Sequence, residues 1–235
     1  SLVQDEHHGG LKKSAWVDAH KPGTYDAMLR TAQNVAERYN VSRDKQDDYA
    51  FSSQMRTAAA QRDGRFAAEI VPITTVKLVT DKATGAVSEV EVTLERDEGN
   101  RPDTTRQGLS TLPPVLEPGT SITAGNASQL SDGSSACIIM EASEAQRRNI
   151  NPLGAFRGLV TVGSEPDEMG IGPVPAVRRL LQRFNLKMDD IGLWELNEAF
   201  AVQVVWSRDQ LGIPDELLNV NGGAISIGHP YGMSG

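Results

Sequence analysis

The spacing of apolar positions predicts two consecutive helices early in the chain. The first stripe has apolar side chains three and four positions apart, at Met28, Ala32, Val35, Ala36 and Tyr39. Ser42 then offers the side chain of a helix N-cap. The second stripe contains Phe51, Met55, Ala58 and Ala59. Because Asp63 and Gly64 form a typical helix stop, the pattern predicts a pair of amphipathic helices that ends there.

Period-two alternation predicts a β-hairpin after the helix pair. Residues 70–73 and 76–79 have extended character, and residues 90–94 alternate between apolar and polar side chains. Residues 81–85 supply the turn between them. From residue 97 to residue 119 the chain is polar and interrupted by prolines, which predicts an ordered loop on the surface.

Beyond residue 120, short apolar runs alternate with helical stripes. Residues 134–140, 153–162 and 191–196 predict strands, the first of them buried. One helix is predicted to open at Pro173, and another to span residues 198–211. This alternation is typical of α/β proteins, which place their chemistry where strands end at helix N-termini. A last apolar segment, 219–227, predicts a strand that leads into a glycine-rich loop.

Composition narrows the class of protein. The 235 residues are 39% hydrophobic and 23% charged, as in soluble globular proteins. The net charge of -8 argues against nucleic acid as a partner, and no apolar run reaches the roughly 18 residues that span a membrane. A single cysteine, Cys137, excludes an intrachain disulfide framework and fits a reducing compartment. We expect a cytoplasmic protein, with an organelle matrix as the alternative.

The two ends of the chain predict a fragment of a longer polypeptide. The chain opens Ser-Leu-Val-Gln, without an initiator methionine or a signal pattern, and it stops inside a glycine-rich loop at residue 235.

Four segments carry possible chemistry, each with an ordinary structural alternative. They are residues 123–128, 169–173, 197–200 and 228–230. Taken singly, Asn197 fits a helix cap and His229 fits a turn histidine, although histidine is also the usual base near neutral pH. Ser128 fits a turn and Met169 fits core packing equally well.

Together and in this order, the segments resemble the thiolase family. The sequence Asn-Glu-Ala-Phe at 197–200, followed by Asn-Gly-Gly-Ala-Ile-Ser-Ile-Gly-His-Pro-Tyr-Gly-Met-Ser-Gly at 221–235, is the most specific part. Three further segments are also similar to family sequence: Thr-Ala-Gly-Asn-Ala-Ser, Met-Gly-Ile-Gly-Pro and Asp-Glu-Gly-Asn-Arg, which begin at residues 123, 169 and 97. The resemblance covers nearly the whole chain, least clearly residues 1–25.

The resemblance implies a fold and a reaction. The fold would be α/β, with two related halves of layered helices and mixed sheets and an inserted loop domain, here incomplete at both ends. Residues 1–120 would be the loop domain, 121–150 the end of the N-terminal half, and 151–235 the start of the C-terminal half. The reaction would be acyl transfer between coenzyme A thioesters through a cysteine acyl-enzyme: thiolysis of a 3-oxoacyl-CoA, or the reverse condensation of acetyl-CoA. Coenzyme A would be a substrate and no cofactor would be bound permanently. The subunits would form homodimers or homotetramers.

The resemblance also implies site residues. His229 matches the histidine that activates the nucleophilic cysteine and polarises a thioester oxygen. Asn197 matches the asparagine that holds a water, which with the histidine forms an oxyanion hole. The coenzyme A side would consist of Ser128 at the pantetheine arm, Arg101 near the nucleotide, Met169 in the acyl pocket and Met28. Arg101 equally fits a solvated loop, and Met28 fits the apolar stripe of its helix.

Departures from the family pattern limit what the 235 residues are expected to do. The family's nucleophilic cysteine would precede residue 1 and its acid/base cysteine would follow residue 235, so we expect the chain alone to be inactive. Cys137 is interpreted as a buried, inert thiol in a strand. Ala27 stands where some members carry a histidine that contacts coenzyme A.

Two other functions stay open. A non-catalytic, thioester-binding relative would lack the upstream cysteine. A condensing enzyme of the ketoacyl synthase type is disfavoured by the intact Asn197 motif.

The sequence predicts no metal site. His7 and His8 are adjacent, which suits joint chelation poorly, and neither they nor His20 have a carboxylate cluster beside them. The acidic pairs 47–48 and 189–190 are interpreted as solvated or helix-capping groups.

Overall fold

The predicted helix pair is present and begins the core. The structure is a computed structural model that describes residues 13–234. Helices α3 (Met28–Arg38) and α4 (Arg43–Arg62) follow the short, exposed helix α2 (Ala15–His20). The Ser42 hydroxyl accepts the Lys45 N–H at 3.4 Å and so caps α4. Gly64 adopts φ +69 just after the helix, a conformation that glycine tolerates best.

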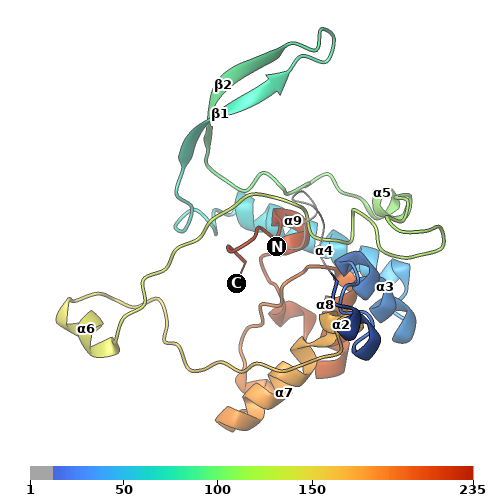
Figure 1. Ribbon diagram of the computed structural model, residues 1–235. Coiled ribbons are helices and arrows are strands. Elements are labelled where there is room, and N and C mark those ends of the chain that lie inside the picture. Colours follow the sequence, from blue (N-terminus) through green and yellow to red (C-terminus); the bar gives the residue numbers. More distant parts are fainter. Residues whose placement is uncertain (1–12, 235) are drawn as a thin grey trace.

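The core lies around helix α8 (Ala201–Leu211), which packs against α3, α4 and α7 (Pro173–Phe184). Its valines 202, 204 and 205 are fully buried, and α7 opens at Pro173 as predicted. Figure 1 shows α8 surrounded by these helices. Helix α8 begins three residues later than the predicted residue 198, because Phe200 is extended and forms a β-bridge with Ala127.

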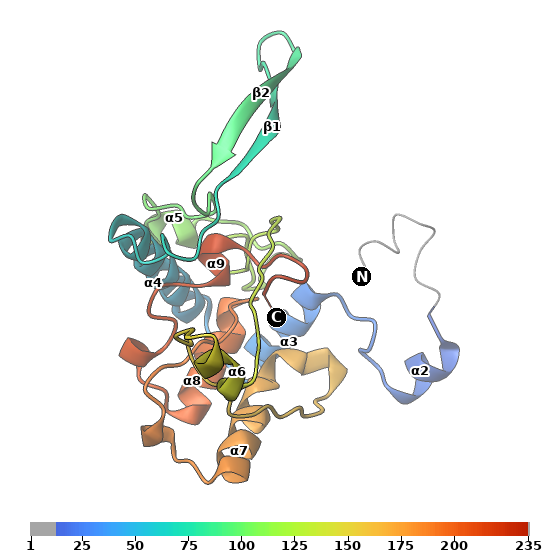
Figure 2. The same cartoon turned by 90° about the vertical axis from the view of Figure 1, so that its left-hand side faces the viewer.

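The predicted hairpin is also confirmed. Strands β1 (Ile73–Thr80) and β2 (Val87–Leu94) pair antiparallel, with Ile73 opposite Leu94. The Asp81 carboxylate accepts the N–H groups of Ala83 and Thr84, both at 2.8 Å, which closes the turn. The hairpin projects away from the helical core in both views (Figures 1 and 2).

The prediction of strands is wrong for three segments. Among the described residues, 134–140 and 153–162 have no ladder partners, and most of their side chains are exposed. In the same part of the chain, residues 191–196 form a single parallel bridge, Trp194 to Leu218. A strand needs a hydrogen-bonded neighbour, and within residues 13–234 the hairpin is the only sheet. Cys137 is therefore exposed, which corrects its interpretation as a buried thiol.

The segment before the glycine-rich loop is a helix instead of the predicted strand. Helix α9 (Ala224–Ile227) is short and packs against α4. Its first three residues are buried: Ala224, Ile225 and Ser226. Periodicity does not distinguish a short buried helix from a strand, so the contacts of the folded protein decide.

Smaller elements complete the described chain. Helix α6 (Ala142–Arg147) stands apart from the core (Figure 1). No helix in residues 13–234 is long and apolar enough to cross a membrane. The remaining bounds are α5 (Arg106–Ser110), η1 (Pro166–Ile171), η2 (Met188–Asp190) and η3 (Asp215–Leu217).

Candidate active site

Asn197 and His229, 32 residues apart in sequence, meet at the C-terminal end of the described chain. The Asn197 Nδ2 and His229 Nε2 atoms are 3.2 Å apart, and both residues are exposed. An amide nitrogen only donates, so in this arrangement Nε2 accepts and a neutral imidazole carries its proton on Nδ1. The pair thus presents one amide donor and one imidazole base to the same open surface.

The loop that carries His229 depends on a glycine. Gly228 has φ +97, and a Cβ at this position would lie 1.8 Å from the Ser131 hydroxyl oxygen. The His229 N–H donates to the Gln129 carbonyl at 3.2 Å. Pro230 is buried, and a Cβ on Gly133 would lie 2.8 Å from its ring. The chain around residues 129–133 therefore forms the wall against which this loop rests.

Ser128 is held next to the Asn197 turn by backbone pairing. Its N–H donates to the Ala199 carbonyl at 2.9 Å, and the Ala201 N–H donates to the Asn126 carbonyl at 2.8 Å. Residues 126–128 therefore run alongside residues 199–201. This pairing, together with the bond from the His229 N–H to the Gln129 carbonyl, brings three of the four segments singled out in the sequence together.

The fourth segment is attached through Gln203. A Cβ on Gly170 would lie 3.2 Å from the Gln203 side chain, whose Nε2 donates to the Asn197 carbonyl at 3.1 Å. Met169, in η1, precedes that glycine and is 45% exposed, so it is available to a ligand and does not fill the core.

Met28 is joined to the same region less directly. It is the first residue of α3 and is also 45% exposed, which contradicts its alternative placement in the core stripe. Helix α3 binds η1 through Arg38, which pairs with Asp167 and with Glu168, the latter at 2.9 Å. This arginine holds the pKa of the Asp167 carboxyl below its usual range.

Arg101 is held at its backbone while its side chain is exposed. The buried Gln54 accepts the Arg101 N–H at 2.9 Å and donates to the Ile225 carbonyl in α9 at 3.3 Å. The Gln129 amide donates to both the Gly99 and Ile225 carbonyls at 2.9 Å. These two glutamines join the loop of Arg101 to the helix that leads to His229.

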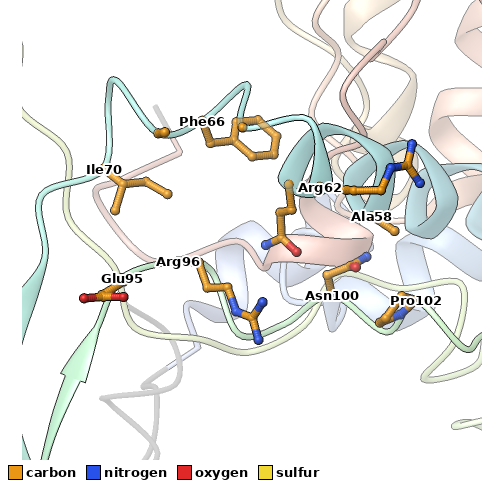
Figure 3. Close-up of a pocket in the computed structure, with 11 residues that line it drawn as sticks. Ala58, Arg62, Phe66, Ile70, Glu95, Arg96, Asn100 and Pro102 are labelled. Atoms are coloured by element: carbon orange, nitrogen blue, oxygen red, sulfur yellow. The ribbon is translucent and has the colours of Figure 1, made fainter.

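A pocket of about 290 Å³ lies between the end of α4 and the base of the hairpin (Figure 3). Arg62, Phe66 and Arg96 are among its lining residues, and Asn100 and Pro102 flank Arg101. None of the six predicted site residues lines this pocket, so it is separate from the Asn197–His229 pair.

Glu198 is a feature of the site that sequence reasoning missed. Its side chain is fully buried, yet its carboxylate accepts four hydrogen bonds. The donors are Tyr49 Oη at 2.7 Å, Ser53 Oγ at 2.6 Å, Ile225 N at 3.1 Å and Asn219 Nδ2 at 3.2 Å. Burial, and then the charge of Glu198, raise the pKa of the Tyr49 phenol. The available signal was an acid directly followed by the apolar residues Ala199 to Val202.

Within residues 13–234, no cluster of three or more His, Cys, Asp or Glu side chains is arranged to hold a metal ion. His20 stacks on Trp16 with ring centroids 4.3 Å apart. His7 and His8 lie outside the described residues. Asp47 was interpreted as solvated or capping, but it is buried and pairs with Arg43 at 2.7 Å.

Comparison with known proteins identifies the class to which this fold and site belong. Two family models match the chain: the thiolase N-terminal domain over residues 2–143 and the thiolase C-terminal domain over residues 150–235. The chain belongs to the thiolase family.

Named relatives are consistent with that assignment. The chain is 48% identical over 208 residues to peroxisomal 3-ketoacyl-CoA thiolase A of Mus musculus, an alignment of 88% of this chain and 48% of the mouse protein. It is 44% identical over 216 residues to 3-ketoacyl-CoA thiolase of Bacillus subtilis, covering 91% of this chain and 54% of the relative. The chain therefore spans about half the length of the curated relatives that it matches.

Solved structures show the same fold. The crystal structure of Bacillus anthracis acetyl-CoA acetyltransferase matches with a TM-score of 0.83 and 34% identity, covering 97% of this chain and 57% of that chain. The dimeric peroxisomal thiolase of Saccharomyces cerevisiae matches with a TM-score of 0.82 and 33% identity, covering 96% and 55%. The predicted α/β thiolase fold is confirmed for the part of it that this chain covers.

Proposed function

We propose that the complete protein, the product of the whole gene, is an acyltransferase that acts on coenzyme A thioesters. The reaction is thiolysis of a 3-oxoacyl-CoA such as acetoacetyl-CoA, or the reverse condensation of two acetyl-CoA molecules. The observation that carries the proposal is the 3.2 Å contact between Asn197 Nδ2 and His229 Nε2 in an exposed position. The names of the mouse and Bacillus relatives support the same class of reaction.

His229 and Asn197 have separate tasks in the proposed reaction. The neutral imidazole takes the proton of a cysteine thiol, and the resulting thiolate attacks the C3 carbonyl carbon of the 3-oxoacyl-CoA. The C2–C3 bond then breaks, the acyl group stays on the cysteine, and the departing acetyl-CoA carbanion takes a proton from a second cysteine, the acid/base of the reaction. The thiol of coenzyme A returns a proton to that second cysteine and its sulfur attacks the acyl-enzyme. The bond between the acyl group and the first cysteine then breaks, a new thioester leaves, and the released thiolate regains its proton from His229. Asn197 holds a water that, with His229, stabilises negative charge on a thioester oxygen.

Other residues bind substrate in this proposal. Ser128 contacts the pantetheine arm, Arg101 the nucleotide, and Met169 and Met28 line the acyl side. On the same basis, residues 1–120 form the inserted loop domain, 121–150 end the N-terminal half and 151–235 begin the C-terminal half. The protein works as a homodimer or homotetramer in the cytoplasm or in an organelle matrix.

The test is consumption of acetoacetyl-CoA by the complete protein in the presence of coenzyme A. We expect His229→Ala to lower kcat by about 10²- to 10⁴-fold, the usual contribution of a general base. We expect Asn197→Ala to lower kcat by about 10²- to 10³-fold, as for loss of an oxyanion donor. His20→Ala, which changes a histidine stacked on Trp16, is the matched control and should retain full activity.

Two outcomes would contradict the proposal. Unchanged turnover in both site variants would show that this pair has no part in the reaction. Coenzyme A binding without any turnover by the complete protein would favour the non-catalytic relative. Because the proposal assigns the nucleophile to a cysteine other than Cys137, residues 1–235 alone should show no turnover in the same assay.

A further inference from the structure

The Glu198 carboxylate joins parts of the chain that are far apart in sequence. Two of its donors, Tyr49 and Ser53, come from α4, while Asn219 follows η3 and Ile225 lies in α9. An ionised carboxylate with 0% exposure is costly unless it is fully hydrogen-bonded, and here each oxygen accepts two bonds. The hydrogen bonds therefore constrain the positions of the four donors relative to the carboxylate.

These bonds act on both loops of the candidate site. Glu198 directly follows Asn197, and Ile225 stands four residues before His229. Asn219 also fixes the residue before Asn197, because its side chain accepts the Leu196 N–H and donates to the Leu196 carbonyl, both at 2.8 Å. The hydrogen bonds of the carboxylate and of Asn219 thus connect the turn of Asn197 to the helix that leads to His229.

Gly223 shows that the approach of α9 to this carboxylate is close. A Cβ at residue 223 would lie 2.6 Å from Glu198 Cδ. Only a residue without a Cβ fits here, so the backbone at the start of α9 lies directly against the carboxylate. A change in the position of the carboxylate would therefore also move α9 and the loop of His229.

We infer that Glu198 is a positioning residue, which sets the contact between Asn197 Nδ2 and His229 Nε2 by holding α9 against the Asn197 turn. This inference rests on the proposed function in that Asn197 and His229 are taken as the reacting pair. Glu198 itself is buried and touches no substrate.

The variant that tests the inference is Glu198→Gln in the complete protein. The change preserves shape, but an amide NH₂ faces two of the four donors whichever way it turns, so two of the four hydrogen bonds to this side chain are lost. Asp47→Asn is the matched control, since Asp47 is a buried carboxylate in α4 that accepts bonds from Arg43 and Asn126. No hydrogen bond of its side chain reaches the Asn197 turn or α9 within the described residues.

The first readout separates positioning from general stability. Displacement of reacting groups by about 1 Å can cost 10²-fold, so we expect Glu198→Gln to lower kcat for acetoacetyl-CoA thiolysis by roughly 10- to 100-fold. The KM for coenzyme A should stay within about twofold, because none of the proposed binding residues is hydrogen-bonded to the Glu198 side chain. Asp47→Asn should retain kcat even if its midpoint of urea unfolding falls as far as the midpoint of Glu198→Gln does. A kcat retained in Glu198→Gln would overturn the inference and leave the proposed function intact.

The second readout does not need activity. In ¹⁵N-histidine-labelled protein, the Nε2 resonance of His229 is the one lost in His229→Gln, and it should move in Glu198→Gln but not in Asp47→Asn. If the complete protein shows no turnover, the proposed function fails, and an unmoved resonance would then overturn the positioning inference separately. If Glu198→Gln does not fold, Ser53→Ala removes one donor and keeps the carboxylate, and it should move the same resonance by less.

Discussion

The substitution Tyr49→Phe measures how strongly the buried carboxylate network stabilises the fold. It removes the 2.7 Å bond from the phenol to Glu198 and the 2.9 Å bond from Asn219 Nδ2 to the phenol oxygen. Asn219 Nδ2 keeps Leu196 O and Glu198 as acceptors, so no buried donor is orphaned. The loss is therefore close to that of one hydrogen bond to a charged group, and we expect the free energy of unfolding to fall by about 2 kcal/mol.

The same substitution has a pH signature. Burial, and then Glu198, raise the pKa of Tyr49 in the folded protein, while an unfolded tyrosine loses its proton near pH 10. Above about pH 10, loss of the Tyr49 proton therefore favours the unfolded state. The equilibrium constant for unfolding rises by about tenfold for each further pH unit. The variant lacks this titration, so its deficit relative to the parent should shrink as the pH rises above 10.

The measurement is urea unfolding of the complete protein followed by circular dichroism, at about pH 7, 10 and 11. Tyr25→Phe is the control, because among residues 13–234 the Tyr25 hydroxyl accepts one hydrogen bond, from the backbone N–H of Ser14 at the surface, and bonds no carboxylate. Equal stability of parent and Tyr49→Phe at neutral pH would refute the role of the hydroxyl. A deficit that stays constant up to about pH 11 would refute the linkage to Glu198 and burial.

Two further predictions concern the loop and the core. Gly228→Ala should lower kcat by about 10²-fold in the thiolysis assay, because the added Cβ meets Ser131 and displaces His229; Gly212→Ala, also at positive φ but with open space around it, should keep kcat. Leu218→Ala should lower the free energy of unfolding by about 2–5 kcal/mol in urea titrations, because Leu218 is fully buried beside α8. The half-exposed Leu186 is its control, and an equal effect of Leu186→Ala would contradict the assignment of the core.

Local patterns in the sequence were sufficient for the elements whose stabilising features are local. The helix pair, the hairpin and the helix at Pro173 each contain their own periodicity, cap or turn residues, such as Ser42, Asp81 and Gly64. The order of the motif segments also led to the thiolase family, which the family models confirm. The pairing of Asn197 with His229 was expected from that resemblance, not from spacing.

What the tertiary structure decided concerns contacts between distant residues. A short buried apolar run is compatible with helix or strand, and only the packing of residues 224–227 beside α4 and Glu198 makes them a helix. Cys137 lies in a segment that its sequence predicts to be buried, yet no neighbouring strand covers it within the described residues. The sequence determined which residue types are present at the site; burial and long-range hydrogen bonds, which depend on the whole fold, determined that Glu198 holds the two loops of that site together.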